Sequence, residues 1–376
     1  MSKLLRTLAI GSALALALTA CGSRPVDESP GSGGGGSAET AEAKDFRACM
    51  VSDSGGFDDK SFNQTSYKGL QDAKAKLGIE ESTVESKSDN DYPKNVDGMV
   101  SAGCDVIITV GFKLGNQTAI SAAKNPDVKF GIVDFDIGTV DLEEVGLDEV
   151  PGNVKSLLFD TAQPSFLAGY LAAGMSKTGK VGTFGGLPIP TVTIFMDGFW
   201  EGVQYYNERK GTSVQVLGWD ETTQKGLFTN SFENKAQGRN TANNLISQGA
   251  DVIFPVAGPA GLGGLEAARA SRGKVAAIWV DTDGCVSAQE YCDVLLTSVT
   301  KGMDVAVEEV ITSVYEERFD NTPYVGTLAN DGTGLAPYHE FEDKIPDELK
   351  QEVEQLRQDI IDGKVTVKST AVPKAR

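Results

Sequence analysis

Short apolar runs alternate with amphipathic stretches along most of this 376-residue chain, and this order limits the folds it can adopt. The apolar runs do not alternate with polar residues, which is typical of strands buried on both faces. We expect strands at 46–51, 82–85, 106–110, 129–133, 180–184, 214–218, 252–255, 275–280 and 295–298. We expect helices at 61–76, 92–102, 116–124, 164–176, 192–210, 234–248, 261–271 and 303–315, where apolar residues recur at helical spacing.

This β-α-β order predicts parallel, doubly wound sheets, because right-handed crossovers place helices on both faces of a sheet. The expected strands are too many for one sheet of ordinary size. The length also suits two lobes of roughly 150 residues each. The sequence therefore predicts an α/β protein with two sheets.

The N-terminus has the features of a secretory signal. Lys3 and Arg6 precede the apolar run 8–18, which is shorter than the ~20 residues of a membrane-spanning helix. The run leads into Leu-Thr-Ala-Cys ending at Cys21, which resembles a bacterial lipobox and predicts a signal peptide at 1–20 and lipid at Cys21. The alternative is an ordinary signal with a chance cysteine. Residues 21–44 then read as a flexible Gly/Ser-rich tether.

Charge and composition exclude some partners. The net charge of −19 argues against nucleic acid and anionic lipid headgroups, whose phosphates would be repelled. The 40% hydrophobic and 23% charged content is that of a soluble globular body. Acidity by itself names no ligand.

Four cysteines follow Cys21. Cys285 and Cys292 could close a small loop, which would leave Cys49 and Cys104 as the second pair. Four cysteines allow three connectivities, and the sequence does not choose among them. We expect no zinc site, because the chain has no CxxC motif and only one histidine, His339.

Polar and glycine-rich clusters follow the expected strands directly, where ligands bind in parallel α/β sheets. They are Asp53 with FDDKSFN (57–63), Gly111-Phe112, Asp134 with Asp136, VAGPAGLGG (256–264), VDTDG (280–284), Lys301 with Ser298 and Thr300, and, in a loop, Asn230-Ser231-Phe232.

These clusters match no familiar catalytic or metal motif. The first lacks the spacing of a calcium loop, no GxSxG occurs, and the glycine-rich stretch is neither a Walker A loop nor a clear dinucleotide turn. Asp58 and Asp59 read as capping acids of the following helix. Asp53 ends a strand and should project into a cleft, whereas Phe62 could face either core or cleft.

The set is coherent for one kind of ligand. Carboxylates and a lysine are typical partners of vicinal hydroxyls, aromatic faces suit a flat ring, and a carboxylate can accept from the N–H of a heterocycle. A sugar joined to a base is a nucleoside.

The residues also resemble a known family, the basic membrane protein family of lipoproteins, which are purine nucleoside receptor A-like substrate-binding proteins of ABC transporters. The similarity covers essentially the whole chain after the tether. It is carried by DSGGFDDKSFNQTSYKGL (53–70), DVIITVGF, NPDVKFGIVD, PSFLAGYLAA, MDGFWEGV, SFENKAQGRNTA, VAGPAGLGG, LTSVTKGMDVAV, DGTGLAPYHEF and DIIDGKVTV.

The resemblance implies a type I periplasmic-binding-protein fold, with two lobes joined by a hinge. We expect lobe 1 at 45–160 plus about 285–318, and lobe 2 at 161–284 plus about 319–376. It also implies roles for nine residues: Phe62 and Phe232 as stacking rings, Asp53 as the polar residue of the opening motif, Asp134 or its neighbour Asp136 as base reader, Gly258, Asp281 and Lys301 on the ribose side, and Asn63 in a secondary role.

The expected function is a monomeric, lipid-anchored receptor on the extracytoplasmic face of the cell membrane. It would capture a nucleoside, preferably a purine nucleoside, and deliver it to an ABC permease and its ATPase, without catalysis, cofactor or metal. The alternatives are a free-sugar receptor of the same fold and a nucleoside hydrolase.

Overall fold

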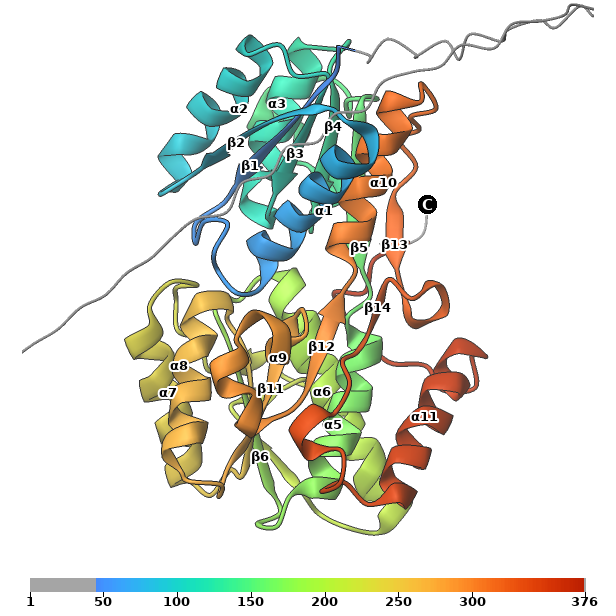
Figure 1. The fold of residues 1–376 in the computed structure, drawn as a ribbon. Helices are drawn as coiled ribbons and strands as arrows, with labels where there is room; N and C mark the ends of the chain where they lie inside the picture. Colours follow the sequence, from blue (N-terminus) through green and yellow to red (C-terminus); the bar gives the residue numbers. More distant parts are fainter. Residues whose placement is uncertain (1–44, 375–376) are drawn as a thin grey trace, which may run out of the picture. The chain divides into compact units, whose positions relative to one another are not determined.

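The computed structural model describes residues 45–374, which form two six-stranded β-sheets (Figure 1). The expected signal peptide, the lipid site at Cys21 and the tether lie outside the described residues. The first sheet has the order β13-β5-β4-β3-β1-β2, and all its neighbouring strands are parallel. Its strands are β1 (Arg47–Ser52), β2 (Glu80–Glu85), β3 (Val106–Val110), β4 (Lys129–Val133), β5 (Val154–Phe159) and β13 (Tyr324–Gly326).

The second sheet has the order β14-β12-β11-β10-β6-β7 and is parallel except for β14, which runs antiparallel to β12. Its strands are β6 (Lys180–Gly185), β7 (Gln215–Leu217), β10 (Val252–Val256), β11 (Ala276–Asp281), β12 (Leu295–Lys301) and β14 (Thr333–Leu335). A small antiparallel hairpin joins β8 (Trp219–Asp220) to β9 (Lys225–Gly226).

Helices cover both faces of the first sheet, and we call this unit lobe 1 (Figure 1). Residues of β1 point alternately into two cores: Met50 packs with α1 and α10, whereas Cys49 and Val51 pack with α2 and α3. Burial on both faces explains the uninterrupted apolar strands. The helices are α1 (Phe62–Leu77), α2 (Tyr92–Ser101), α3 (Gly115–Lys124), α4 (Leu142–Val145) and α10 (Met303–Tyr315), with short 3₁₀ turns η1 (Asp89–Asp91), η2 (Phe112–Leu114) and η3 (Ile137–Thr139).

Lobe 2 is the second sheet with its own helices on both faces. One core lies under α5, α6 and α11, and the other under α7 and α8. Helices α5 and α6 approach closely, and glycine at position 202 permits this contact. A Cβ at Gly202 would lie 2.0 Å from the Phe166 carbonyl oxygen. The elements are α5 (Ala162–Met175), α6 (Pro190–Lys210), α7 (Lys235–Ser247), α8 (Gly258–Ala270), α9 (Gly284–Ser287), α11 (Asp347–Ile361), η4 (Gln289–Val294), η5 (Leu328–Asn330) and η6 (His339–Phe341).

The chain passes between the lobes three times, after β5, after β12 and between β13 and β14. Two strands therefore lie in the lobe opposite to the one expected from the sequence: β12 belongs to lobe 2, and β13 belongs to lobe 1. The second and third crossings come only after β12 ends and after β13 ends. The expected boundaries near residues 285 and 319 lie before these two strands and are therefore too early in the chain.

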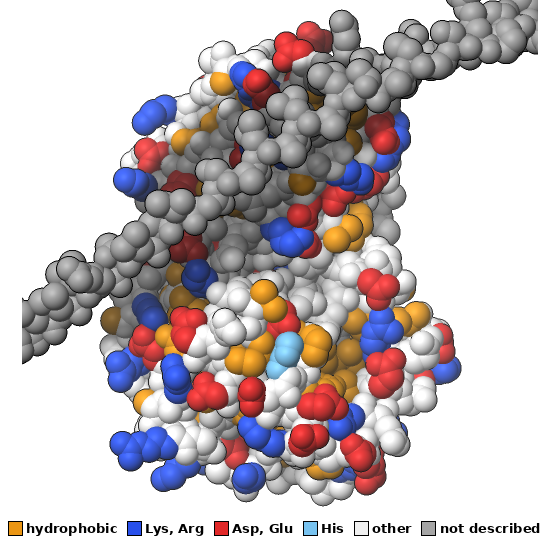
Figure 2. All heavy atoms as spheres, in the orientation of Figure 1, with side chains coloured by type: hydrophobic (Ala, Val, Ile, Leu, Met, Phe, Trp, Pro, Cys, Tyr) orange, Lys and Arg blue, Asp and Glu red, His pale blue; other side chains and the backbone are white. Residues whose placement is uncertain are grey.

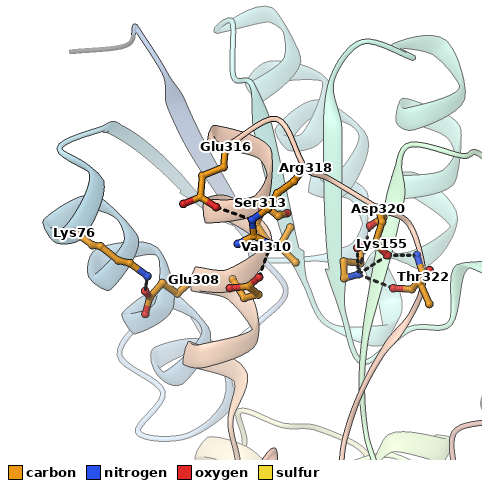
Figure 3. Close-up of polar contacts among 10 residues, drawn as sticks. Lys76, Lys155, Glu308, Val310, Ser313, Glu316, Arg318, Asp320 and Thr322 are labelled. Carbon is orange, nitrogen blue, oxygen red and sulfur yellow. Dashed lines mark hydrogen bonds and ion pairs between the residues drawn. The ribbon is translucent and has the colours of Figure 1, made fainter. Parts of the chain in front are cut away.

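Polar contacts fix the returning segment to lobe 1 (Figure 3). Lys76 of α1 pairs with Glu308 of α10 at 2.6 Å. The Lys155 ammonium of β5 donates to the Thr322 carbonyl at 2.7 Å and to the Asp320 carboxylate at 3.1 Å. These bonds hold the chain between α10 and β13 against the edge of the first sheet.

Most of the expected elements are present, but β5, β13, β14 and α11 were not predicted. Strand β5 contains Lys155 and Ser156, which interrupt its apolar run, and β13 and β14 have three residues each. Helix α11 is largely polar. Its buried residues Leu349, Val353, Leu356 and Ile360 nevertheless follow a helical spacing that could have revealed it.

Two disulfides join Cys49 to Cys104 and Cys285 to Cys292, one of the three pairings that the sequence allowed. Charged side chains of both signs are interspersed over the visible face of lobe 2 (Figure 2). Within residues 45–374, no helix combines the length and the apolar character that crossing a membrane requires.

Candidate functional site

The carboxyl ends of strands from both sheets meet at one cleft, whose empty space is about 640 Å³ when its solvent-open mouth is included. Lobe 1 contributes residues that follow β1, β3 and β4, and lobe 2 contributes residues that follow β6 and β10 and the last residues of β11 and β12. Eight of the nine residues proposed from the sequence line this cavity: Asp53, Phe62, Asn63, Asp134, Phe232, Gly258, Asp281 and Lys301. Asp136 does not, and lines a neighbouring cavity instead.

The start of α1 is fixed by Asp59, a buried carboxylate. It accepts from the backbone N–H groups of Ser61 (2.9 Å), Asn63 (2.8 Å) and Gln64 (3.0 Å), which a helix N-terminus leaves without intrahelical partners. Burial raises the pKa of Asp59 to about 6, although these bonds oppose the shift. The capping role expected of Asp58 is wrong: that side chain is exposed and pairs with Lys60.

Asp53 and Asn63 form a polar pair at one end of the cavity. The Asn63 amide donates to Asp53 Oδ1 at 3.0 Å. Burial raises the pKa of Asp53 to about 7, and the bond from Asn63 limits the rise. The other amide atom, Asn63 Oδ1, is buried and has no hydrogen-bond partner in the described part of the chain. The pair therefore offers the cavity one unused acceptor and one carboxylate that titrates near neutral pH.

A second polar group also lines the cavity and joins the two lobes. Lys301 of β12 pairs with Asp134 at 2.5 Å and lies 3.8 Å from Asp281. Ser61 of lobe 1 donates to Asp281 of lobe 2 at 2.5 Å. All four side chains are buried. Burial raises the pKa values of Asp134 and Asp281, and the Lys301 charge offsets part of each shift.

Asp134 and Asp281 share an uncommon backbone conformation. Their φ angles are 63° and 70°, in the left-handed region that Asp and Asn tolerate better than most residues with a side chain. Each carboxylate stands at or directly after the end of a strand, β4 or β11. Strained backbone of this kind clusters at functional sites, where the surrounding structure holds it in place.

Aromatic rings supply apolar wall on both sides. Phe62 lines the cavity from the first turn of α1 in lobe 1, and Phe232 lines it from a loop of lobe 2. The Phe232 ring lies against Gly186, where an added Cβ would come within 2.4 Å of it. The Lys301 ammonium lies 4.9 Å from the Phe62 ring centroid. The cavity thus combines flat apolar walls with charged groups.

Several lining residues were missed by the sequence analysis. They include Thr191, Val192 and Phe195, from the first turns of α6. This helix follows β6, as the other clusters follow their strands, so position in the βα order was the available signal. Trp279 was also missed. Its indole N–H donates to the Lys60 carbonyl at 3.1 Å and forms a further bond between the lobes.

One group outside the cavity has the residue types of a metal site. Asp283, Cys285 and His339 place potential ligand atoms within 4.8 Å of one another. The Cys285 sulfur is, however, bonded to Cys292, which removes the thiolate that a metal would require. The exposed His339 pairs with Asp283 at 2.7 Å.

Two doubly wound lobes that enclose a polar cleft at their strand ends define a two-lobed solute-binding protein of the type I periplasmic-binding-protein fold. A crystal structure of an ABC transporter solute-binding protein from Aeropyrum pernix K1 has this fold, with a TM-score of 0.74 and 26% identity, covering 85% of this chain and 92% of that one.

The model of the family described as "ABC transporter substrate-binding protein PnrA-like" matches residues 46–371, so the chain belongs to this family of substrate-binding proteins. Basic membrane protein A of Borreliella burgdorferi is 32% identical over 317 residues, which cover 84% of this chain and 86% of the relative. The ABC transporter nucleoside-binding protein BmpA of Lactococcus lactis is 29% identical over 385 residues, covering 97% and 99%.

Proposed function

We propose that this protein captures a purine nucleoside in the cleft between its lobes for import by an ABC transporter. One observation carries the proposal: a single cleft is lined by an amide–carboxylate pair, a carboxylate–lysine cluster and an aromatic ring from each lobe. This is the complement of a flat base joined to a sugar with hydroxyls. The name of the Lactococcus lactis relative, a nucleoside-binding protein, agrees with it.

The base is assigned to the Asp53 and Asn63 end. Asn63 Oδ1 is buried without a partner among residues 45–374, and a ring N–H or amino group would supply the missing donor. Ionised Asp53 would accept a second bond from the N–H of a 6-oxopurine such as hypoxanthine or guanine. Phe62 and Phe232 would stack on the base faces. A base without these donors would leave a buried acceptor unpaired, which costs affinity.

The ribose is assigned to Asp134, Lys301 and Asp281. Two carboxylates and an ammonium can together accept from and donate to the hydroxyls of a ribose. The family resemblance implies base reading by Asp134 or Asp136. Because Asp134 forms an ion pair with Lys301, we assign Asp134 to the ribose and not to the base. Asp136 lines the neighbouring cavity, so we assign it to neither the base nor the ribose.

Capture would couple to transport through the lobes. A ligand that contacts both lobes favours the closed arrangement, and the permease would read that arrangement. Cys21, followed by the tether 22–44, would hold the receptor at the outer face of the cell membrane by lipid. Delivery to a permease and action as a monomer are parts of the same proposal.

Calorimetry with inosine, hypoxanthine and ribose tests this function. Inosine should bind more tightly than either fragment, because only the nucleoside contacts both the Asp53–Asn63 pair and the Asp134–Lys301–Asp281 cluster. Ribose binding as tight as inosine binding would instead support a free-sugar receptor. The same inosine, recovered after incubation with excess protein, should be intact; release of hypoxanthine would indicate a nucleoside hydrolase.

A further inference from the structure

A second chamber adjoins the nucleoside cavity. Its empty space is about 1060 Å³ when its solvent-open mouth is included, and Phe112, Asp134, Thr191 and Lys301 line both spaces. The ion pair between Asp134 and Lys301 therefore lies at the boundary between the two. A group attached to whichever part of the ligand meets this pair would enter the second chamber.

The C-terminal segment 370–374 forms one wall of this chamber. The segment is fixed to lobe 2 rather than merely lying near it. Ser369 donates to Asp197 Oδ2 at 2.6 Å, and Asp197 is a fully buried residue of α6. Ala371 and Val372 pack against the core of lobe 2. The wall is thus part of the folded lobe and can present its side chains in defined positions.

The chamber contains a buried polar atom that lacks a partner. Thr161 is 1% exposed, lines the chamber, and its hydroxyl makes no hydrogen bond within residues 45–374. Buried hydroxyls are rarely left unsatisfied, and a polar occupant that reaches Thr161 would supply the missing partner. The wall also carries charges of both signs, a carboxylate at Asp136 and an ammonium at Lys374, together with the hydroxyls of Thr139 and Thr370.

We infer that the second chamber is a ligand subsite for a zwitterionic or hydroxylated substituent on the ribose, so that the receptor accepts 5′-substituted nucleosides, and that residues 370–374 help to recognise the substituent. This inference rests on the proposed function, in which Asp134 and Lys301 hold the ribose, and it places the 5′ position of the ribose at this pair and the vicinal hydroxyls at Asp281. An amino-acid substituent fits the lining well, because its ammonium and carboxylate groups match a wall that carries both charges.

The test compares a nucleoside with its homocysteine thioether: adenosine with S-adenosylhomocysteine, or inosine with S-inosylhomocysteine if inosine is the tighter nucleoside. The parent and its thioether are titrated by calorimetry into the protein, a chain that ends after Ser369, and a control chain that ends after Lys374. The inference predicts that the protein binds the thioether within about tenfold of the parent nucleoside. The chain ending after Ser369 should lose at least about tenfold for the thioether alone, and the control chain should lose nothing.

A second variant, Thr161→Val in the full-length chain, tests the inference independently of whether the shortened chain folds. It should weaken the thioether by about threefold to tenfold, the effect of one lost hydrogen bond, and leave the parent nucleoside unchanged. A thioether that binds the protein more than about tenfold more weakly than its parent would overturn the inference. So would equal losses of both ligands in the shortened chain. If neither ligand binds the intact protein, the proposed function fails together with the inference. If the parent nucleoside binds and the thioether does not, only the inference fails.

Discussion

At the scale of single residues, the site depends on where titratable groups are buried. The sequence identified the residue types at the strand ends, because carboxylates and glycines that follow strands stand out locally. It could not show that Lys301 pairs with Asp134, 167 residues away in the chain, since that contact forms only between the two lobes. Nor could it show that Asp53 has only the Asn63 amide as its hydrogen-bonding side-chain partner in the described chain.

Nucleoside binding should depend on pH through Asp53, whose pKa is raised to about 7. Below this pH the carboxyl holds its proton and is a weaker acceptor for the ring N–H of inosine; above it, the ionised form accepts a stronger, charge-assisted bond. The ionised fraction of a group with this pKa rises about tenfold between pH 6 and pH 8, so inosine affinity should rise by about the same factor.

Calorimetry at the two pH values measures this change, and the control is Asp53→Asn, which should flatten the profile. Adenosine, whose N1 accepts rather than donates, should show the opposite slope in the unmodified protein. Inosine affinity that falls with rising pH would contradict the assignment of the base to Asp53.

Phe232 should contribute to binding by stacking on the base. Phe232→Ala should weaken inosine binding by about 1–3 kcal/mol, the usual contribution of base–aromatic stacking. The matched control is Phe319→Ala, because Phe319 is also partly buried in a loop but packs on lobe 1 outside the cavity. Calorimetry measures the affinities of both variants. Unchanged inosine affinity in Phe232→Ala would contradict stacking of Phe232 on the base.

At the scale of elements, the sequence was most informative where burial is complete. Strands such as β3, whose five residues are all buried, are visible as apolar runs, and parallel pairing follows from the helices between them. Strand β5 is not apparent in the sequence because Lys155 and Ser156 interrupt its apolar run. The strands β13 and β14 contain too few residues to show a pattern. Capping was predicted for two acids, but only three-dimensional placement shows that Asp59 performs it.

The two neighbouring acids give a direct test of this cap. Asp59→Ala should lower the free energy of unfolding by about 1–3 kcal/mol, because three backbone N–H groups of α1 would lose a buried acceptor. Asp58→Ala should change it by less than about 0.5 kcal/mol, as expected of an exposed side chain. Urea unfolding at neutral pH measures both, and equal effects of the two substitutions would contradict the assignment.

At the scale of the whole molecule, three polar contacts connect the lobes around the cavity: Ser61 to Asp281, Lys301 to Asp134, and Trp279 to the Lys60 carbonyl. Each joins residues far apart in the sequence, so none could be predicted from local pattern. The lobe boundaries could be predicted only approximately for the same reason, because β12 and β13 lie beside the crossings. The resemblance to a family supplied the two-lobed arrangement that residue patterns alone left open.

The contact from Ser61 should stabilise the closed arrangement. Ser61→Ala removes a hydrogen bond to a carboxylate across the cleft, which should weaken nucleoside binding by about 1–2 kcal/mol, mainly through faster dissociation. Stopped-flow dissociation rates measure this effect. Ser66→Ala is the control, since Ser66 is buried in α1, the helix that Ser61 directly precedes, but bonds within lobe 1. Similar dissociation rates for the two variants would contradict a role for Ser61 in closure.

The central claim is that the cleft holds an intact nucleoside, and native mass spectrometry of the protein purified without added ligand tests it most directly. The account predicts a bound species whose mass, after release, is that of a purine nucleoside or a 5′-substituted derivative of one. After inosine is added, it should displace the retained ligand, and the only bound species should have the mass of inosine. A retained monosaccharide that inosine does not displace would contradict the account, and so would a protein that takes up no nucleoside at all.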